Sequence, residues 1–223
     1  MPGPRLIRLS TVALLLAGSV AAVGTGPAAA VDFKQETASA EVRQVASWAL
    51  QSGDSGGYPY LIVDKVNARV FVFDARGRLQ GADAALLGMA RGDRSERGIG
   101  ERKLSAITPI ERITPAGRFM ASIDHDLHGG EILLIDYAAS LALHPVIKGT
   151  PGEHRAERLN SPTSQDNRIS YGCINVPAMF YANVVSPAFT KTNGVVYILP
   201  ETGSAKALFE SPIAQTMPQE KSP

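Results

Sequence analysis

From residue 58 onwards, the apolar residues of this chain come in short runs rich in β-branched and aromatic side chains, and turn residues separate these runs. Such runs are typical of strands, because these side chains pack well on a pleated surface. Asn67 lies between the first two runs, and asparagine tolerates the positive φ that a hairpin turn needs. The sequence therefore predicts a mainly β fold. The expected strands are 61–63, 69–73, 118–123, 131–136, 140–144 and 194–199.

Two helices are expected beside these strands. Apolar residues recur at helical spacing over 37–51, and 177–185 has a proline in its first turn, where the missing N–H is not needed. The polar segments 91–118 and 145–168 are predicted to be solvated loops. We expect a helical lead-in and linker at 31–57, one folded domain at 58–202 and a flexible tail at 203–223.

The first thirty residues have the layout of a secretory signal peptide. Arg5 and Arg8 form a positive start, an apolar run without charges follows over 9–23, and three alanines at 28–30 supply a small-residue cleavage pattern. The run is too short for a comfortable membrane span, which needs about 20 apolar residues. We therefore expect residues 1–30 to be removed. The mature protein is then expected in the periplasm or cell envelope, without a stable membrane span.

The composition excludes two broad classes of protein. Lys and Arg number 22 against 21 Asp and Glu, a formal charge of +1, so the chain lacks the positive excess of a generic nucleic-acid binder. Hydrophobic residues make up 44% and charged residues 19%, which excludes global disorder.

Cys173 is the only cysteine of the chain, so a disulfide within the chain and a zinc site with two thiolates are both excluded. In an oxidising compartment, a free thiol is either buried or in use. Gly172 allows the backbone to bend so that N–H groups converge beside the sulfur, and a helix start just downstream favours a thiolate. The residues alone leave a buried structural cysteine and a nucleophile equally open.

A cysteine nucleophile needs a base, which is usually histidine. The chain has four histidines and all precede the cysteine: His125, His128, His144 and His154. This order excludes a papain-like site, whose histidine follows the cysteine. No arginine follows Arg168, which excludes a sortase-like site. His144 ends an apolar strand and is well placed at a site edge, whereas His125 and His128 are predicted to lie in a turn rather than in a metal site.

Three separated segments resemble the L,D-transpeptidases, the YkuD-like catalytic domains of bacterial cell walls. The runs 61–64 and 70–74 look like the opening hairpin of that family. Residues 114–119 are similar to its threonine-proline-x-glycine-x-phenylalanine segment. The last segment is the most specific, since His144 and the run 170–175 resemble the family's histidine plus serine-histidine-glycine-cysteine signature. That run consists of Ser170, Tyr171, Gly172, Cys173, Ile174 and Asn175. The resemblance covers about residues 58–200.

This resemblance implies a β-sandwich-like fold with one or two short helices, and an acyl-forming nucleophile at Cys173. His144 would be the base, oriented by the backbone carbonyl of Pro145. The N–H groups around Gly172 and Cys173 would hold the oxyanion. Supporting roles would fall to three further residues of the motif: Ser170, Tyr171 and Asn175. The chemistry needs no metal and no cofactor.

The function implied by the resemblance is that of an exported cysteine acyltransferase acting on peptidoglycan tetrapeptide stems. It would perform L,D-transpeptidation through a thioester, or L,D-carboxypeptidase hydrolysis where water replaces the acceptor amine. Carbapenem-type inhibitors would acylate the same thiol. The sequence does not predict an oligomeric state.

Two departures from the family pattern leave alternatives open. Tyr171 stands where the motif has a histidine, so a wall-binding or scaffold protein that keeps the fold without the chemistry is the rival hypothesis. The segment between His144 and Ser170 is longer than the family's usual gap, and His154 fits that gap better, which makes it the alternative base. His144 is favoured because it follows an apolar strand, whereas His154 lies in the charged run 153–158, predicted to be a solvated loop or a cap over the cleft.

Overall fold

The computed structural model describes residues 31–210, together with Met1 and Gly3. The rest of the predicted signal peptide and residues 211–223 of the predicted tail lie outside the described residues. None of the helices in the described part of the chain is long and apolar enough to cross a membrane.

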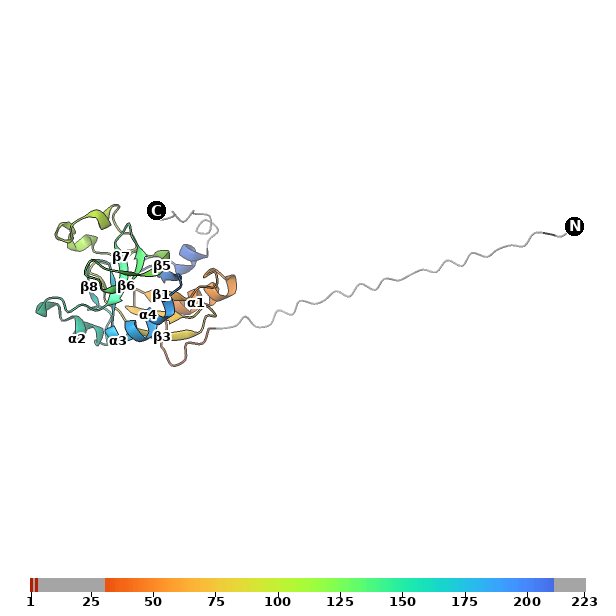
Figure 1. The fold of residues 1–223 in the computed structure, drawn as a ribbon, viewed down its shortest axis with the longest axis horizontal. Helices are drawn as coiled ribbons and strands as arrows, with labels where there is room; N and C mark the ends of the chain where they lie inside the picture. The colour runs from red at the N-terminus through yellow and green to blue at the C-terminus, as the bar shows by residue number, and fades with distance from the viewer. Residues whose placement is uncertain (2, 4–30, 211–223) are drawn as a thin grey trace.

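Eight strands form one sheet in the order β3-β2-β1-β10-β5-β6-β7-β9. Five of them, β1, β3, β5, β6 and β7, are labelled in Figure 1. The bounds of all eight are β1 (Tyr60–Asp64), β2 (Arg69–Phe73), β3 (Leu79–Ala84), β5 (Gly117–His125), β6 (Glu131–Asp136), β7 (Leu141–Pro145), β9 (Ile174–Val176) and β10 (Gly194–Ile198). Two short strands, β4 (Leu87–Gly88) and β8 (Arg168–Ser170), pair in parallel beside it. The predicted mainly β fold is confirmed.

The helices are few and short. They are α1 (Ala40–Ser52), α2 (Arg155–Leu159), α3 (Ala178–Phe180), α4 (Ser186–Phe189) and α5 (Ala205–Phe209), and a π-helical turn, Tyr181–Val185, joins α3 to α4. Helix α1 begins after Ser39, whose side chain accepts a hydrogen bond from the Val42 N–H at 3.2 Å. It ends at Gly53, which has a left-handed φ of 69°.

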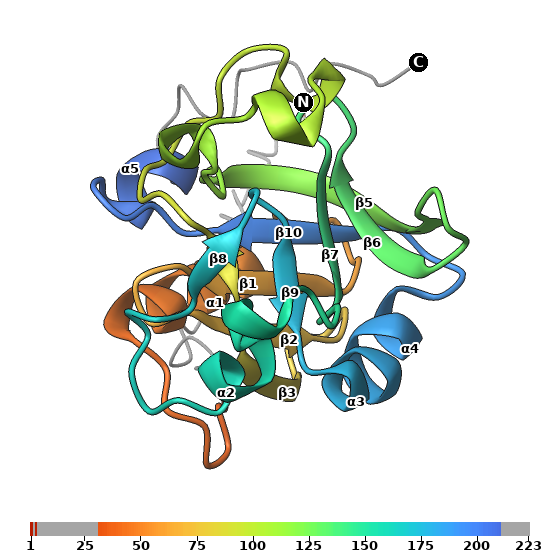
Figure 2. The same ribbon diagram turned by 90° about the vertical axis from the view of Figure 1, so that its left-hand side faces the viewer.

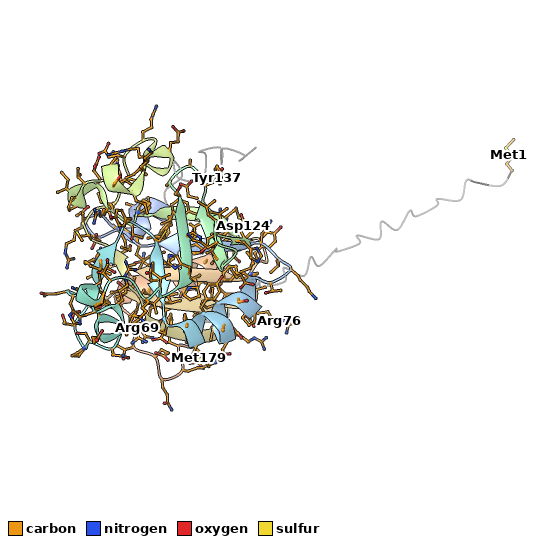
Figure 3. All side chains as sticks on the ribbon, turned by 60° about the vertical axis from the view of Figure 1, so that its left-hand side comes forward. Met1, Arg69, Arg76, Asp124, Tyr137 and Met179 are labelled. Atoms are coloured by element: carbon orange, nitrogen blue, oxygen red, sulfur yellow. The ribbon has the colours of Figure 1, made fainter. Side chains whose placement is uncertain are left out.

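Both faces of the central strands are buried, because their side chains alternate between two hydrophobic clusters. In β1, Leu61 and Val63 enter one cluster, and Tyr60 and Ile62 enter the other. Helices α1 and α5 supply the second cluster, whereas the α3–α4 segment packs on the first (Figure 2). Met179 of α3 is exposed on the outer side of that segment (Figure 3).

The first cluster also receives side chains from the other half of the sheet. Leu133 of β6, Leu143 of β7 and Ile174 of β9 pack in the same cluster as Leu61. The sheet therefore curls around this cluster, and the nine-residue strand β5 pairs with β10 on one side and β6 on the other. Strands β7 and β9 are the last two strands of the sheet, and the candidate site lies at this end.

Several segments are more ordered than the sequence predicts. Residues 203–210 belong to the predicted flexible tail, yet they include α5, whose Phe209 is buried and stacks on Trp48 of α1. The predicted linker also packs into the domain, since Asp54 accepts a hydrogen bond from Arg118 of β5 at 2.6 Å. The segment 145–168, predicted to be a solvated loop, contains α2.

Candidate active site

The motif cysteine and the strand-end histidine belong to two paired strands, since His144 lies in β7 and Cys173 directly precedes β9. The two strands pair in parallel, with Leu143 opposite Ile174 and His144 opposite Asn175. Cys173 directly precedes Ile174, whose side chain enters the core. Because side chains alternate along a strand, Cys173 and Asn175 face away from that core, on the same side as His144.

The thiol of Cys173 is half-buried and points toward a backbone carbonyl. Its Sγ lies 3.5 Å from the carbonyl oxygen of Ser140, in the turn before β7. Burial raises the pKa of the Cys173 thiol, while the backbone N–H groups of Ala142 and of Cys173 itself act in the opposite direction by favouring the thiolate. The resting group is therefore a thiol, and its conversion to a nucleophile requires a base.

The imidazole of His144 is held at both of its nitrogens. Nδ1 lies 2.8 Å from the carbonyl oxygen of Pro145, and Nε2 lies 3.3 Å from the side-chain Nδ2 of Asn175. The other amide atom of Asn175, Oδ1, accepts a hydrogen bond from Arg155 Nη1 at 2.8 Å. The Asn175 Nδ2 also lies 3.4 Å from the carbonyl oxygen of Cys173.

This chain of contacts determines the tautomer of His144. A guanidinium only donates, so Arg155 requires Oδ1 of Asn175 to face it and turns the amide Nδ2–H toward Nε2. Nε2 must then accept, so the ring proton is on Nδ1, where it donates to the Pro145 carbonyl. Nε2 of His144 is therefore unprotonated, as a general base requires, and in the resting structure its lone pair faces the Asn175 amide.

The charge state of His144 agrees with that tautomer. Burial lowers the pKa of His144 below its ordinary value, and the hydrogen bond to Pro145 opposes this shift. The positive charge of Arg155 lowers the pKa further, whereas the carboxylate of Asp126 raises it. The ring is consequently neutral at pH 7.

The loop that carries Cys173 is fixed by hydroxyl groups. Ser170 Oγ donates to the Cys173 carbonyl at 2.6 Å and accepts from the Gly172 N–H at 3.1 Å. Thr114, fully buried, donates from Oγ1 to the Gly172 carbonyl at 2.7 Å and accepts from the Gly88 N–H at 2.8 Å. Gly172 has a φ of 138°, and a Cβ there would stand 2.9 Å from the Ile113 carbonyl oxygen, so the position requires glycine.

One expectation for the oxyanion site needs revision. The Gly172 N–H is already engaged by Ser170, whereas the N–H groups that favour a negative sulfur belong to Cys173 and Ala142.

Tyr171 packs against a segment that covers the thiol. Its ring lies under the guanidinium of Arg112, whose Cζ is 3.8 Å from the ring centroid. Arg112 Nε and Nη2 in turn donate to the Ile107 carbonyl at 3.3 and 3.2 Å. Tyr171 thus joins the cysteine loop to the covering segment of residues 95–115, and its ring has no hydrogen bond to His144 among the described residues.

A cavity of about 330 Å³ opens beside the thiol, between the cysteine loop and the covering segment. Tyr171, Gly172, Cys173 and Ser140 line it on one side. The covering segment contributes mainly aliphatic side chains to the rest of the lining: Ile99, Leu104, Ile107 and Ile113.

The remaining histidines lie outside this arrangement. His154 has a side chain that is 65% exposed, and its Nδ1 lies 3.7 Å from the Glu157 carboxylate within α2. His125 and His128 are exposed in the connection from β5 to β6, where Asp126 accepts the His128 N–H at 2.8 Å and closes the turn.

Sequence reasoning missed Arg155 and the supporting role of Thr114. Arg155 stands in a charged run that suggests a solvated surface, yet only 8% of its side chain is exposed. The available signal is the pattern Thr150–Glu153, a capping box that begins a short helical turn just before Arg155. The sequence marks Thr114 only as the first residue of the resembling segment 114–119.

No family model matches this chain, and no curated protein matches it. Among solved structures, the chain is similar to the LD transpeptidase LdtMt1 in complex with imipenem, at 15% identity and a TM-score of 0.36 over 63% of this chain and 58% of that one. It is also similar to a mutant of the helical cell shape determining protein Pgp2 from Campylobacter jejuni, at 12% identity and a TM-score of 0.43 over 71% of this chain and 55% of that one. The chain thus spans little more than half of either protein, and similarity at this level concerns only the course of the backbone.

Proposed function

We propose that this chain is an exported cysteine acyltransferase that acts on peptidoglycan stem peptides. The observation that carries the proposal is the base: His144 presents an unprotonated Nε2, oriented by Asn175 and Pro145, on the strand that pairs with the one following Cys173. A thiol with a raised pKa needs such a base for acyl transfer, in which the proton leaves the sulfur as it attacks.

In the proposed reaction the thiol of Cys173 first turns from the Ser140 carbonyl toward His144. The sulfur attacks the carbonyl carbon between the third and fourth residues of a tetrapeptide stem, and Nε2 of His144 takes the thiol proton. The negative oxygen is held by the N–H groups of Cys173 and Ala142. The C–N bond then breaks, and the departing D-alanine amine takes the proton from His144, which leaves a thioester.

The second half reverses these roles. An amine of a neighbouring stem attacks the thioester carbonyl, His144 accepts the amine proton, and the proton returns to the departing sulfur. Water in place of the amine gives L,D-carboxypeptidase hydrolysis. The chemistry uses only residues of this chain together with the substrate.

The proposed location follows from the substrate. Peptidoglycan stems lie in the cell envelope, and the signal-peptide pattern at residues 1–30 supports export to that compartment. The expected ligands are stem peptides and carbapenem-type inhibitors, and nucleic acid is not expected.

Incubation of the purified protein with a muropeptide tetrapeptide, followed by liquid chromatography and mass spectrometry, tests the proposal. We expect release of the terminal D-alanine together with cross-linked dimers or shortened tripeptides, and neither product from Cys173→Ala. The ratio of dimers to tripeptides separates transfer from hydrolysis.

The rival hypothesis, a wall-binding protein without activity, predicts a different pair of results. Wild-type protein and Cys173→Ala would bind muropeptides equally, and neither would release D-alanine. That outcome, with both proteins folded by circular dichroism, would overturn the proposed activity.

A further inference from the structure

A second cavity, of about 290 Å³, lies between the turn that joins β1 to β2, the end of the edge strand β3 and residues 161–167. None of the residues that line it also lines the cavity beside Cys173. Its volume is close to the lower end of the range of small-ligand sites, which is about 300 to 1,000 Å³. The cavity therefore suits one small ligand unit, and the proposed acyl transfer does not use it.

The uncharged polar side chains of this lining offer both hydrogen-bond donors and acceptors. Ser161 Oγ accepts the Thr163 N–H at 3.3 Å, and Thr163 Oγ1 accepts the Gln165 N–H at 3.2 Å. Neither hydroxyl donates to another described residue, so both hydroxyl hydrogens can be donated to a ligand. Asn67 Nδ2 donates to Asp64 Oδ2 at 2.8 Å, which leaves the Asn67 Oδ1 as an acceptor.

The charged side chains of the lining disfavour an anion. Asp83 is the one acidic residue of the lining, and its Oδ1 accepts the Ala84 N–H at 2.8 Å. Burial raises the pKa of Asp83, so its carboxylate gains from additional hydrogen-bond donors. Arg69 is the one basic residue of the lining, and its Nη2 already pairs with Glu36 at 2.7 Å. An anion would thus lie beside Asp83 without finding an unpaired cation.

Two side chains of the lining also keep buried polar atoms without a hydrogen-bond partner among the described residues. These atoms are Arg69 Nε and Asn167 Oδ1. Asn167 is 3% exposed, and its Nδ2 donates to the Ala85 carbonyl at 3.0 Å. An unpaired buried polar atom costs stability, so the fold keeps polar groups here that its stability does not require. Such departures are expected at functional sites.

The apolar part of the lining is small. It consists of Ala68, Ala84 and Pro162, which form no pocket for a long aliphatic or aromatic side chain. They can contact the C–H face of a sugar ring, whose hydroxyl groups each donate one hydrogen bond and accept others. Such a ligand matches a lining that mixes donors and acceptors around a few small apolar residues.

We propose that this cavity binds one neutral sugar unit. Sugar hydroxyl groups donate to the Asp83 carboxylate and the Asn67 Oδ1, and they accept from the hydroxyl group of Thr163 or Ser161. The site goes beyond the proposed acyl transfer and does not depend on it. The glycan strands of peptidoglycan consist of N-acetylated sugars, so the site would add a contact with the wall to the one made at the stem peptide.

The test is a titration of the purified, ¹⁵N-labelled protein with N-acetylglucosamine, followed through the backbone amide signals in NMR spectra. We expect shifts at the residues that line the cavity, with a Kd of about 1 to 10 mM, because a single small and open site binds weakly. Glucuronic acid, an anionic sugar, should bind at least about fivefold more weakly, since its carboxylate is repelled by Asp83. Ethylammonium, a cation without hydroxyl groups, should cause no comparable shifts.

Three variants locate the binding. Thr163 is exposed in the lining, so Thr163→Val should fold and should raise the Kd for N-acetylglucosamine about two- to tenfold through the loss of one hydrogen bond. Thr190 is exposed after α4 and outside the lining, so Thr190→Val is the matched control and should leave the Kd unchanged. Asp83→Asn removes the charge but keeps the shape, and it should reduce the difference between the two sugars to less than about twofold.

Three results would overturn the sugar site. They are no shift at the lining residues with N-acetylglucosamine at about 100 mM, an equal Kd for ethylammonium at the same residues, and equal effects of the two threonine variants. The proposed function fails separately, because Cys173→Ala should bind the sugar with an unchanged Kd. A protein that binds the sugar and never releases D-alanine keeps the sugar site and loses the activity, whereas one that releases D-alanine without binding the sugar does the reverse.

Discussion

The two sides of Cys173 differ in almost every physical respect. On one side, His144, Asn175 and Arg155 form a chain of hydrogen bonds that fixes a proton on one ring nitrogen and leaves the other unprotonated, facing the Asn175 amide. On the other side, Tyr171 and the covering segment line a mainly aliphatic cavity that is partly open to solvent. The polar side can move a proton, and the apolar side can only select what lies beside the sulfur.

Separate parts of the chain therefore position the proton of His144 and select the group that lies beside the sulfur. The polar side depends on the β7–β9 pairing and on α2, whereas the apolar side depends on residues 95–115 and the turn before β7. Substitutions on the polar side should therefore change the proton chemistry and its pH dependence. Substitutions on the apolar side should change the relative rates with different substrates.

The largest effect is expected from the base itself. His144→Ala removes the group that accepts the thiol proton, so kcat/KM for D-alanine release should fall about 10²- to 10⁴-fold. His154→Ala is the matched control, because its exposed ring contacts only Glu157, and its rate should stay within about twofold of wild type. If instead His154→Ala were the inactive variant, the assignment of the base would be wrong.

A smaller effect is expected from Arg155, which acts through Asn175. Arg155→Met frees the Asn175 amide to rotate, and loss of this positioning should lower kcat about 10- to 100-fold with little change in KM. The base works when it is neutral, so activity falls below its pKa. Because Arg155 lowers the pKa of His144, the acid limb of the pH–rate profile should move to higher pH in Arg155→Met.

Arg155→Lys supplies the control for charge. It keeps the positive charge, so its acid limb should stay closer to that of wild type even where the rate drops. A merely structural role for Arg155 would lower the rate without moving the limb in either variant. The pKa of His144, measured by NMR in the resting protein, checks the same shift without any substrate.

Thr114 should affect stability more than chemistry. Thr114→Val leaves the Gly172 carbonyl and the Gly88 N–H buried without partners, so the free energy of unfolding should fall by about 1–3 kcal/mol for each group. Thr114→Ser keeps the hydroxyl and should retain most of that stability. Urea unfolding compares the two, and equal midpoints would show that these hydrogen bonds do not hold the cysteine loop.

The smallest effect is expected at Tyr171. Tyr171→Phe keeps a ring under Arg112, so the rate at which a carbapenem acylates Cys173 should change by less than about twofold. Tyr171→Ala loses a contact of about 0.5–1 kcal/mol at an exposed site and should lower that acylation rate about two- to fivefold. A complete loss of D-alanine release in Tyr171→Phe would instead place the phenol in the proton chemistry.

Local patterns in the sequence predict the strands well. The hairpin of β1 and β2 follows from two β-branched runs around Asn67, and β5, β6, β7 and β10 lie where such runs occur. Strand β9 has only three residues, and its parallel pairing with β7 joins segments about thirty residues apart. No local pattern specifies that register, so the contact of Asn175 with His144 emerges only from the fold.

Arg155 shows why part of the site could not be predicted. A charged residue in a charged run is normally solvated, and its burial depends on an acceptor that β9 supplies from twenty residues away. Helix α5 is a similar case, because Phe209 of this helix is held by its contact with Trp48 of α1. In both cases a long-range partner decides the structure, whereas the local composition indicates a loop or a tail.

Cys173 is proposed to be an acyl-accepting nucleophile activated by His144. The mass of the intact protein after exposure to a carbapenem tests this role directly. Attack on the β-lactam carbonyl forms a thioester and opens the ring, so the protein should gain the mass of one inhibitor, and peptide mapping should locate it on Cys173. The adduct should form much more slowly in His144→Ala and at the wild-type rate in His154→Ala. Folded wild-type protein that gains no mass at Cys173 would contradict the nucleophilic role of Cys173.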